Sequence, residues 1–566
     1  MNAKLRRLLV PSVDGLLAFA LAITMLVALL STEADIGYAR DEGFYFQASG
    51  FYRGWFELLV EHPALALSSQ GVERFWSVNH EHPALIKSLM AASGWLLHDR
   101  WALLPRLGTA ERLPGMLLGS LSVAVVYLWG RRRYGRLGAA VAAVMLATMP
   151  RYFFHSHLAC FDVPVASLWL VSLLTWSWAL RRGGLWRALG FCLMFGLLLD
   201  TKHNAWLLPP LLLVHWLAVT AWGLTSRGSW RGTRWPLPWV LALWLSPLVL
   251  VALWPWLWFD TGARLQEWWR FHAEHVYYNM EFLGRTWWKP PMPRAYAWVM
   301  TAATVPAVTL LAAVLGLSVW ARRLPRPLPW SQTWRALWAP RALVSWGSDG
   351  VSTSPSAGVT SARDALAFDG ALWVIALVGS YAPWFLARTP IFGGTKHWLP
   401  AYPILALLAG LGVSVVAREL GVWMARRRWP SASRWAGQAG LALCVLAAPI
   451  VMTAHVHPNG LSTYTPLVGG TPGAATLGLN RTFWGYTTGS LEPYLRTLRP
   501  GTRVYVHDTA LQSWEMLRRD GRIPPGLRAT LDIAESDVAL YHHEPHMRRV
   551  EYQIWSDYGT VTPQAM

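Results

Sequence analysis

Residues 15–45 read GLLAFALAITMLVALLSTEADIGYARDEGFY, an apolar run that ends shortly before the adjacent carboxylates Asp41 and Glu42. An apolar run of roughly 18 to 22 residues has the length that a helix needs to cross about 30 Å of hydrocarbon. The chain contains only 31 Asp and Glu residues in 566, so an acidic pair beside a membrane span is a candidate for catalysis.

The composition of the whole chain is that of a polytopic membrane protein. Hydrophobic residues make up 54% of the chain and charged residues 14%, and the apolar residues fall in blocks of span length. The net charge of +19 would suggest nucleic acid in a soluble chain, but here arginines cluster between apolar blocks, as a membrane orientation signal does. We therefore expect no nucleic-acid partner. The three cysteines form no CxxC pair and indicate no disulfide or metal framework.

The arginine-rich turns define the expected topology. Placing them in the cytoplasm, together with the basic flank of an uncleaved first span, gives a consistent alternation of about eleven transmembrane helices. The expected spans are residues 14–31, 113–130, 137–154, 163–180, 187–200, 204–222, 237–258, 296–320, 371–388, 398–417 and 438–455. The predicted fold is thus an all-α polytopic membrane protein.

The same topology divides the chain into parts. We expect residues 1–455 to form the transmembrane domain, with external segments at about 32–112 and 259–294 whose aromatic, amphipathic stretches favour helices lying in the membrane interface. The Ser, Gly and Pro content of about 321–370 predicts a flexible cytoplasmic linker. Residues 456–566 are expected outside the membrane as a small soluble domain.

Alternating patterns in this last segment predict an α/β arrangement. Strand-like runs at Arg503–His507 and Val538–Tyr541 alternate with helix-like stretches at Leu491–Leu498 and Gln512–Arg519. The chain also contains 38 Trp residues. We interpret most of them as interfacial anchors, and stacking on a sugar ring is the alternative for one or two.

Ionisable residues gather on the external side of this topology. A charge at mid-membrane costs roughly 2.5–3.5 kcal/mol on insertion scales, so ionisable groups at span ends usually face an aqueous cavity or pair with each other. The residues concerned are Arg40, Asp41, Glu42, Glu81, Lys87, Asp162, Lys202, His272, His275, Lys396 and His397. We expect them to converge on one external cavity.

Several of these residues also have a purely structural explanation. Asp41 and Glu42 can favour a helix N-terminus, and Asp162 before Pro164 is typical of a helix start. Lys202 can extend to lipid headgroups.

A divalent metal site is a further hypothesis. His272 and His275 are three residues apart and can share a helix face, and Glu81 is the best carboxylate to complete the ligand set. The alternative is that these histidines are simply solvated.

Five motifs, taken in order, resemble the GT-C glycosyltransferases. The similarity is greatest to the bacterial branch of the protein O-mannosyltransferase family (glycosyltransferase family 39) and to the lipid A aminoarabinose transferases. The motifs are Asp41-Glu42, HPALIK at 82–87, DVP at 162–164, GLLLDTK at 196–202 and HWLPAYP at 397–403. The resemblance covers roughly residues 1–455.

The resemblance implies transfer of a sugar from a polyprenyl-phosphate carrier to an acceptor hydroxyl on protein, lipid or glycan, with inversion, at the external membrane face. Asp41 takes the position of the catalytic base, with Glu42 as a neighbour able to substitute, and Asp162 matches the second acid. Lys202 matches a basic residue near the donor phosphate.

Further cations are candidates to bind the same phosphate, because negative charge develops on the polyprenyl phosphate as it leaves the sugar. They are Arg40, Lys87, Lys396 and His397. One departure from the family pattern is Glu81-His82-Pro83, where the aminoarabinose transferases have Glu-Lys-Pro. Because position 82 is His and not Lys, a lysine contact to the phosphate is not expected at this position. Glu81 is left as a candidate metal ligand.

The leading hypothesis is therefore a lipid-linked-sugar-dependent glycosyltransferase of the bacterial inner (plasma) membrane, with its active site and C-terminal domain on the periplasmic side. A transporter or flippase for a lipid-linked precursor is the alternative, although the chain has no internal repeat and its polar groups crowd one end of the spans. A third reading is a membrane anchor whose work is done by residues 456–566.

Overall fold

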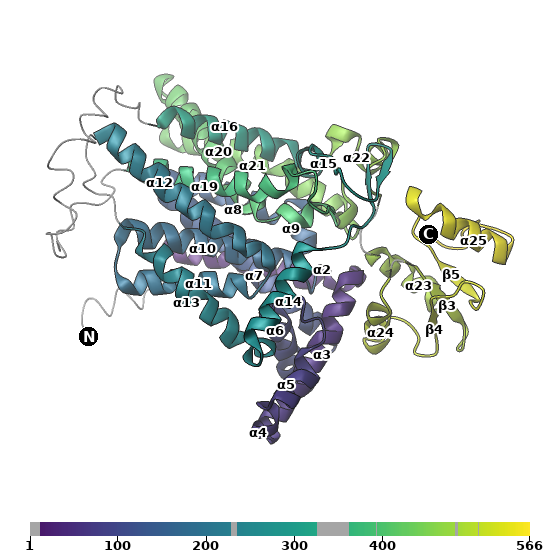
Figure 1. Ribbon diagram of the computed structural model, residues 1–566. Coiled ribbons are helices and arrows are strands. Elements are labelled where there is room, and N and C mark those ends of the chain that lie inside the picture. The colour runs from purple at the N-terminus through teal and green to yellow at the C-terminus, as the bar shows by residue number, and fades with distance from the viewer. Residues whose placement is uncertain (1–11, 228–234, 325–361, 392, 482–484, 508) are drawn as a thin grey trace.

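The computed structural model describes residues 12–227, 235–324, 362–391, 393–481, 485–507 and 509–566. Figure 1 shows a bundle of long helices with a smaller C-terminal part at one end. The helices of the bundle are α2 Val13–Thr32, α7 Leu107–Tyr134, α8 Arg136–Ala147, α9 Pro150–His155, α10 Asp162–Arg182, α11 Leu185–Leu199, α12 Leu208–Arg227, α13 Leu237–Leu253, α15 Tyr296–Thr304, α16 Ala307–Arg323, α19 Ala362–Tyr381, α20 Ala401–Arg426 and α21 Ser431–His455. The predicted all-α membrane architecture is confirmed.

Each of the eleven expected spans overlaps a helix of this bundle, but the count of eleven is not confirmed. Within the described residues, seven helices are long and apolar enough to cross a membrane, and α15 with α16 makes an eighth if this pair is one span. The chain bends by 116° between the two helices. The break contains Pro306, which has no N–H to continue a helix. Helices α8, α11 and α13 are apolar but shorter.

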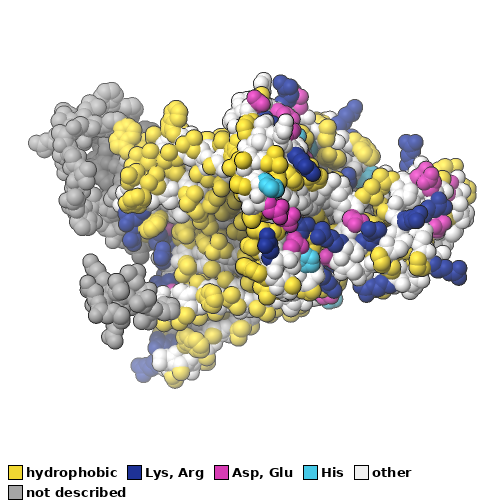
Figure 2. Space-filling model, turned by 90° about the horizontal axis from the view of Figure 1, so that it is seen from below, with side chains coloured by type: hydrophobic (Ala, Val, Ile, Leu, Met, Phe, Trp, Pro, Cys, Tyr) yellow, Lys and Arg dark blue, Asp and Glu magenta, His cyan; other side chains and the backbone are white. Residues whose placement is uncertain are grey.

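The bundle has two chemically different ends. Helices α7, α10 and α20 each end in arginine, at Arg131–Arg133, Arg181–Arg182 and Arg426. Their first turns lie at the opposite end, beside the C-terminal part (Figure 1). Figure 2 shows apolar side chains covering the side of the bundle, with charged side chains gathered toward the C-terminal part. This distribution is the one that a bilayer around the bundle requires.

The linker expected at 321–370 overlaps helices at both of its ends. Helix α16 continues to Arg323 and α19 already begins at Ala362, while 325–361 lie outside the described residues. The physical reason is Asp369, which is buried and accepts hydrogen bonds from Trp129 Nε1 at 2.7 Å and from Arg133. A polar residue with these partners can enter the bundle as part of a helix.

The expected external segment 32–112 contains a helical arm. Its elements are α3 Arg40–Glu61, α4 Pro63–Ala66, α5 Ser69–Trp76 and α6 Leu85–Ser93, followed by the π-helical turn η2 Gly94–Arg100. In Figure 1 helices α3 and α5 run across the direction of the long bundle helices. The second external segment holds α14 Thr261–Ala273 and an antiparallel hairpin, β1 Met280–Phe282 and β2 Arg285–Trp287.

The C-terminal part contains a three-stranded parallel sheet in the order β4-β3-β5. Its main elements are α22 Gly470–Thr476, α23 Glu492–Leu495, β3 Arg503–Val506, α24 Leu511–Arg519, β4 Arg528–Thr530, β5 Val538–Leu540 and α25 Arg548–Tyr558. The two predicted strands and the predicted helix at 512–519 are confirmed. The helix expected at 491–498 is reduced to one turn, α23, and β4 is a strand that the sequence pattern does not predict.

Helices α16 and α20 make one of the closest backbone contacts of the bundle. A Cβ added to Gly316 would lie 1.8 Å from the carbonyl oxygen of Leu408, and one added to Gly412 would lie 2.2 Å from that of Ala312. Small residues allow membrane helices to approach in this way and gain van der Waals contact.

We expect Gly316→Ala to lower the thermal unfolding temperature in detergent, because two backbones must move apart to admit the methyl group. Gly190→Ala in α11 is the matched control, since no atom lies within 4 Å of the added Cβ. Alanine in an open helical position stabilises by roughly 0.5–1 kcal/mol. Equal unfolding temperatures for the two variants would contradict this account of the packing.

Candidate active site

An ion pair joins the first turn of α3 to the short segment that precedes α20. Asp41 lies in the first turn of α3, and its Oδ2 accepts a hydrogen bond from Lys396 Nζ at 2.8 Å. Lys396 lies in the short helix η7, Gly394–Trp398, directly before α20. The Asp41 side chain is 25% exposed and that of Lys396 only 7%. Asp41 is therefore held by a buried cation while remaining accessible from one side.

A second ion pair lies next to the first. Lys202, in the turn after α11, donates from Nζ to Asp162 Oδ1 at 2.6 Å. Burial tends to lower the pKa of Lys396, but the carboxylates of Asp41 and Asp162 outweigh it and leave the pKa above its ordinary value. Both carboxylates thus act on one lysine, and we call Asp41, Asp162, Lys202 and Lys396 the paired-charge cluster. The structure brings together these four predicted residues.

Glu42 has a different role from the one predicted. The side chain is fully buried, and its oxygens accept from Arg112 Nε and Nη2, each at 2.8 Å, from Ala39 N at 2.7 Å and from Ala159 N at 2.8 Å. With both oxygens engaged, Glu42 cannot replace Asp41 as a base, which corrects that expectation. It caps α3 and fixes the helix that carries Asp41.

Lys87 is also directed elsewhere. It is buried and donates to the carbonyl oxygens of Asn79 and His82, the latter at 2.8 Å, so it holds the 79–82 turn rather than reaching the paired-charge cluster. Burial lowers its pKa to about 7. The predicted contact of Lys87 to a donor phosphate is therefore wrong. Its ammonium group has a structural role, because it donates to backbone carbonyls.

Arg40 is exposed at the start of α3, toward the C-terminal part. Burial lowers the pKa of His507 to about 4, and the charges of His542, His546 and Arg40 act in the same direction. The charge of Arg40 therefore acts on His507, the residue that follows β3. The predicted phosphate contact of Arg40 remains a prediction.

The three predicted metal ligands do not form a ligand set. His272 Nε2 donates to the backbone carbonyl of Glu81 at 2.9 Å, and the Glu81 carboxylate accepts from Asn79 Nδ2 at 2.7 Å. The His275 Nδ1 lies 2.7 Å from the carbonyl of Val276. Among the residues that the structure describes, no three His, Cys, Asp or Glu side chains are arranged to hold a metal ion. These residues do not fit a divalent metal, and metal dependence remains an untested prediction.

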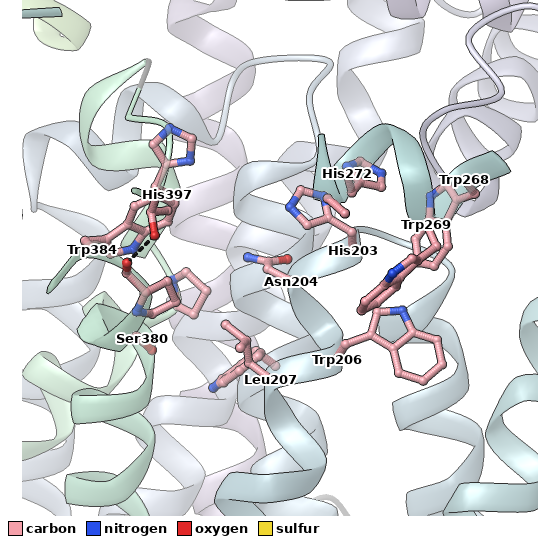
Figure 3. Close-up of a pocket in the computed structure, with 15 residues that line it drawn as sticks. His203, Asn204, Trp206, Leu207, Trp268, Trp269, His272, Ser380, Trp384 and His397 are labelled. Carbon is pink, nitrogen blue, oxygen red and sulfur yellow. Dashed lines mark hydrogen bonds between the residues drawn. The ribbon is translucent and has the colours of Figure 1, made fainter. Parts of the chain in front are cut away.

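An aromatic cavity of about 300 Å³ opens beside the cluster. His203 and His397, which line it, directly follow Lys202 and Lys396 in the chain. Figure 3 shows His397 and Trp384 on one side and Trp206, Trp268 and Trp269 on the other, with the rings of His203 and His272 between them. The lining residues are Trp169, His203, Asn204, Trp206, Leu207, Trp268, Trp269, His272, Ala273, Ser380, Pro383, Trp384, Thr389, His397 and Pro400.

Sequence reasoning placed His397 and His272 near the site but missed the tryptophans. His203 stacks on His272 with ring centroids 4.0 Å apart, and Trp384 lies 4.5 Å from His397. Tryptophans near span ends are interpreted by default as interfacial anchors. The available signal is that Trp206 lies two residues after the Lys202-His203-Asn204 turn.

Fold and site together define a multi-span α-helical membrane protein with a cluster of paired acids and lysines, whose chain neighbours His203 and His397 line an aromatic cavity. Residues 88–258 match the model of the family described as dolichyl-phosphate-mannose-protein mannosyltransferase. The match includes Asp162 and Lys202 and confirms the resemblance to the GT-C glycosyltransferases. The comparison with curated proteins gives no match.

Solved structures with similar chains include a bacterial and an archaeal enzyme. ArnT from Cupriavidus metallidurans, in a crystal structure bound to undecaprenyl phosphate, is 16% identical, with 91% of this chain and 89% of that chain covered and a TM-score of 0.45. The oligosaccharyltransferase AglB from Archaeoglobus fulgidus, in complex with an inhibitory peptide and a dolichol-phosphate, is 11% identical, with 90% and 64% covered and a TM-score of 0.47.

Removing the Glu42 carboxylate should destabilise the fold. Glu42→Ala takes a bidentate partner from a buried Arg112, and breaking a buried pair costs about 3–5 kcal/mol. We expect a large drop in the thermal unfolding temperature of the purified protein. Glu419→Ala is the control, because its exposed pair with Arg418 belongs to a class worth about 0–1 kcal/mol. Similar shifts for the two variants would refute the structural role of Glu42.

Proposed function

We propose that this protein is an integral-membrane glycosyltransferase that moves a sugar from a polyprenyl-phosphate carrier to an acceptor hydroxyl at the external end of the bundle, with inversion at the anomeric carbon. The observation that carries the proposal is the partly exposed Asp41 carboxylate, held by Lys396 beside an aromatic cavity. The family matched by residues 88–258 is described by its use of dolichyl-phosphate-mannose, a lipid-linked sugar, and this supports the class of donor.

In the proposed reaction Asp41 acts as general base. The acceptor hydroxyl must lose its proton as its oxygen attacks the anomeric carbon, and a positioned carboxylate can take that proton. Lys396 engages Oδ2 of Asp41, so Oδ1 is the oxygen that would face the acceptor. As the new glycosidic bond forms, the bond between the sugar and the phosphate oxygen breaks, and the electron pair leaves with the polyprenyl phosphate.

Lys202 is the cation proposed to stabilise that leaving phosphate. Its ammonium is paired with Asp162, which fixes the position of the positive charge before any donor arrives. Pre-positioned charge is worth more than mobile charge, because no reorganisation is needed as the transition state forms. His203 and His397 line the cavity directly next to Lys202 and Lys396 and would be the nearest further polar groups.

The aromatic cavity is proposed to receive the first part of the polyprenyl chain. Its surface is mostly tryptophan and other apolar side chains, and its volume of about 300 Å³ is at the lower limit of ordinary ligand pockets. The acceptor, on protein, lipid or glycan, would approach from the exposed side of Asp41. We propose that this side is periplasmic in a bacterial inner membrane, since the arginine-rich helix ends lie at the opposite end of the bundle.

Asp41→Asn should abolish transfer while leaving donor binding intact, because it removes the proton acceptor and little volume. We expect turnover to fall by about 10²- to 10⁴-fold in an assay that follows labelled sugar from a polyprenyl-phosphate donor. Asp35→Asn is the matched control, an exposed acid a few residues earlier that pairs with His457. Wild-type turnover in Asp41→Asn would eliminate the proposed role of this carboxylate.

Trp206→Ala should weaken donor use without changing the chemical step. Trp206 lines the cavity and is 40% exposed, so its removal leaves the bundle core untouched. A loss of about 1.4 kcal/mol of contact energy corresponds to a tenfold higher KM for the donor. The control is Trp244→Ala, another exposed tryptophan, on α13. An unchanged donor KM in Trp206→Ala would exclude the cavity as the chain-binding site.

A further inference from the structure

The segment that leads into α3 is buried and held from the bundle side. Residues 36–39 connect the short helix η1, Glu33–Asp35, to α3, and all four are buried. Arg112 of α7 donates from Nη1 to the Ile36 carbonyl at 3.0 Å and from Nη2 to the Gly37 carbonyl at 2.8 Å. The position of Asp41 depends on this segment, because Asp41 follows it by two residues.

The C-terminal part holds the same segment from the other side. Arg522 Nη1 donates to the Ile36 carbonyl at 3.1 Å, and Ser513 Oγ donates to the Ala39 carbonyl at 2.8 Å. The hydroxyl of Tyr38 donates to the carboxylate of Asp520. Three contacts to this segment therefore come from α24 and the turn that follows it.

Asp520 also reaches α7. Its carboxylate oxygens accept from the backbone N–H groups of Leu107 and Gly108, each at 3.0 Å. These are the first residues of α7, so Asp520 supplies a cap and a favourable charge for the N-terminus of that helix. A single side chain of the C-terminal part thus connects Tyr38 to the helix that carries Arg112.

Arg522 is fixed in turn by the C-terminal part. It is buried, pairs with Glu492 at 2.6 Å, and its guanidinium lies 5.0 Å from the centroid of the Tyr38 ring. The fit leaves no spare room, because a Cβ added to Gly37 would lie 2.1 Å from the carbonyl oxygen of Tyr486. The two surfaces also share one hydrophobic core, in which Ile36 and Tyr38 are grouped with Trp514 and Leu517.

We propose that the C-terminal part is a positioning element for the catalytic carboxylate, acting through the positioning residues Ser513, Asp520 and Arg522. They hold residues 36–39 so that Asp41 keeps its contact with Lys396 when an acceptor binds. This inference rests on the proposed function of Asp41 as base. The residues that line the donor cavity all fall between Trp169 and Pro400, so the C-terminal part should affect turnover separately from donor binding.

The test compares Arg522→Met with Arg522→Lys in the full-length protein. Methionine keeps the bulk but loses the donors, whereas lysine can still donate to the Ile36 carbonyl and pair with Glu492. We expect Arg522→Met to lower kcat by about 10- to 100-fold with donor KM within twofold of wild type, since small displacements of a catalytic group have effects of this size. Arg522→Lys should recover part of that loss.

Arg518→Met is the matched control on α24, because Arg518 contacts Glu515 at 3.1 Å and the Pro525 carbonyl instead of the 36–39 segment. It should have wild-type kcat. If Arg522→Met does not fold, Tyr38→Phe removes only the hydroxyl that bonds Asp520 and gives the same readout. Each kcat is normalised to the amount of protein that binds donor, which removes any loss due to unfolded protein.

The outcomes separate this inference from the proposed function. Wild-type kcat in folded Arg522→Met and Tyr38→Phe, with Asp41→Asn inactive, overturns the positioning role alone. A parallel change of kcat and donor KM overturns it as well, because that pattern indicates a general disturbance of the bundle. If Asp41→Asn itself retains activity, the proposed function fails and this inference fails with it.

Discussion

The guanidinium group of Arg112 is the constraint on which the end of the bundle beside the C-terminal part depends. It is fully buried, and a buried arginine requires acceptors for all of its N–H groups and a compensating negative charge. Glu33 and Glu42 provide the charge, and the carbonyls of Ile36 and Gly37 provide the remaining acceptors. The chain between α2 and α3 must therefore wrap around this one group. The direction in which α3 leaves the bundle follows from that wrapping.

The helices could be predicted from sequence because apolar runs and arginine-rich turns are properties of single segments. Each expected span overlaps a helix, but whether a short helix such as α8 or α13 crosses the membrane depends on its neighbours. The start of α19 was missed for the same reason. In the sequence Asp369 is typical of a linker. In the structure it lies inside the bundle, because Trp129 and Arg133 donate hydrogen bonds to its carboxylate.

The sequence could collect the four residues of the paired-charge cluster, but it could not predict how they pair. The expected topology alone assigns the ionisable residues to one side of the membrane, because charges avoid the middle of a membrane. It does not distinguish Lys396, which binds Asp41 from 355 positions away, from Lys87, whose ammonium is occupied by the carbonyls of its own turn. The partner of a long side chain is set by tertiary contact, and no spacing in the sequence encodes it. The predicted role of Glu42 is wrong for the same reason. Although Glu42 is next to Asp41 in the sequence, its carboxylate binds Arg112, whereas that of Asp41 binds Lys396.

The two ion pairs also explain how a charged site can exist at the end of an apolar bundle before any substrate arrives. Two carboxylates and two lysines have no net charge together, and each charge is compensated by a partner within 2.8 Å. A phosphate entering beside Lys202 would bring a competing acceptor to an ammonium that is already positioned, so the cost of desolvating that cation has been met during folding. In the proposed reaction, the pair at Lys396 would hold the carboxylate that faces the acceptor, and the pair at Lys202 would hold the cation that faces the donor phosphate. Lys396 links the two pairs, because the charges of both Asp41 and Asp162 act on it.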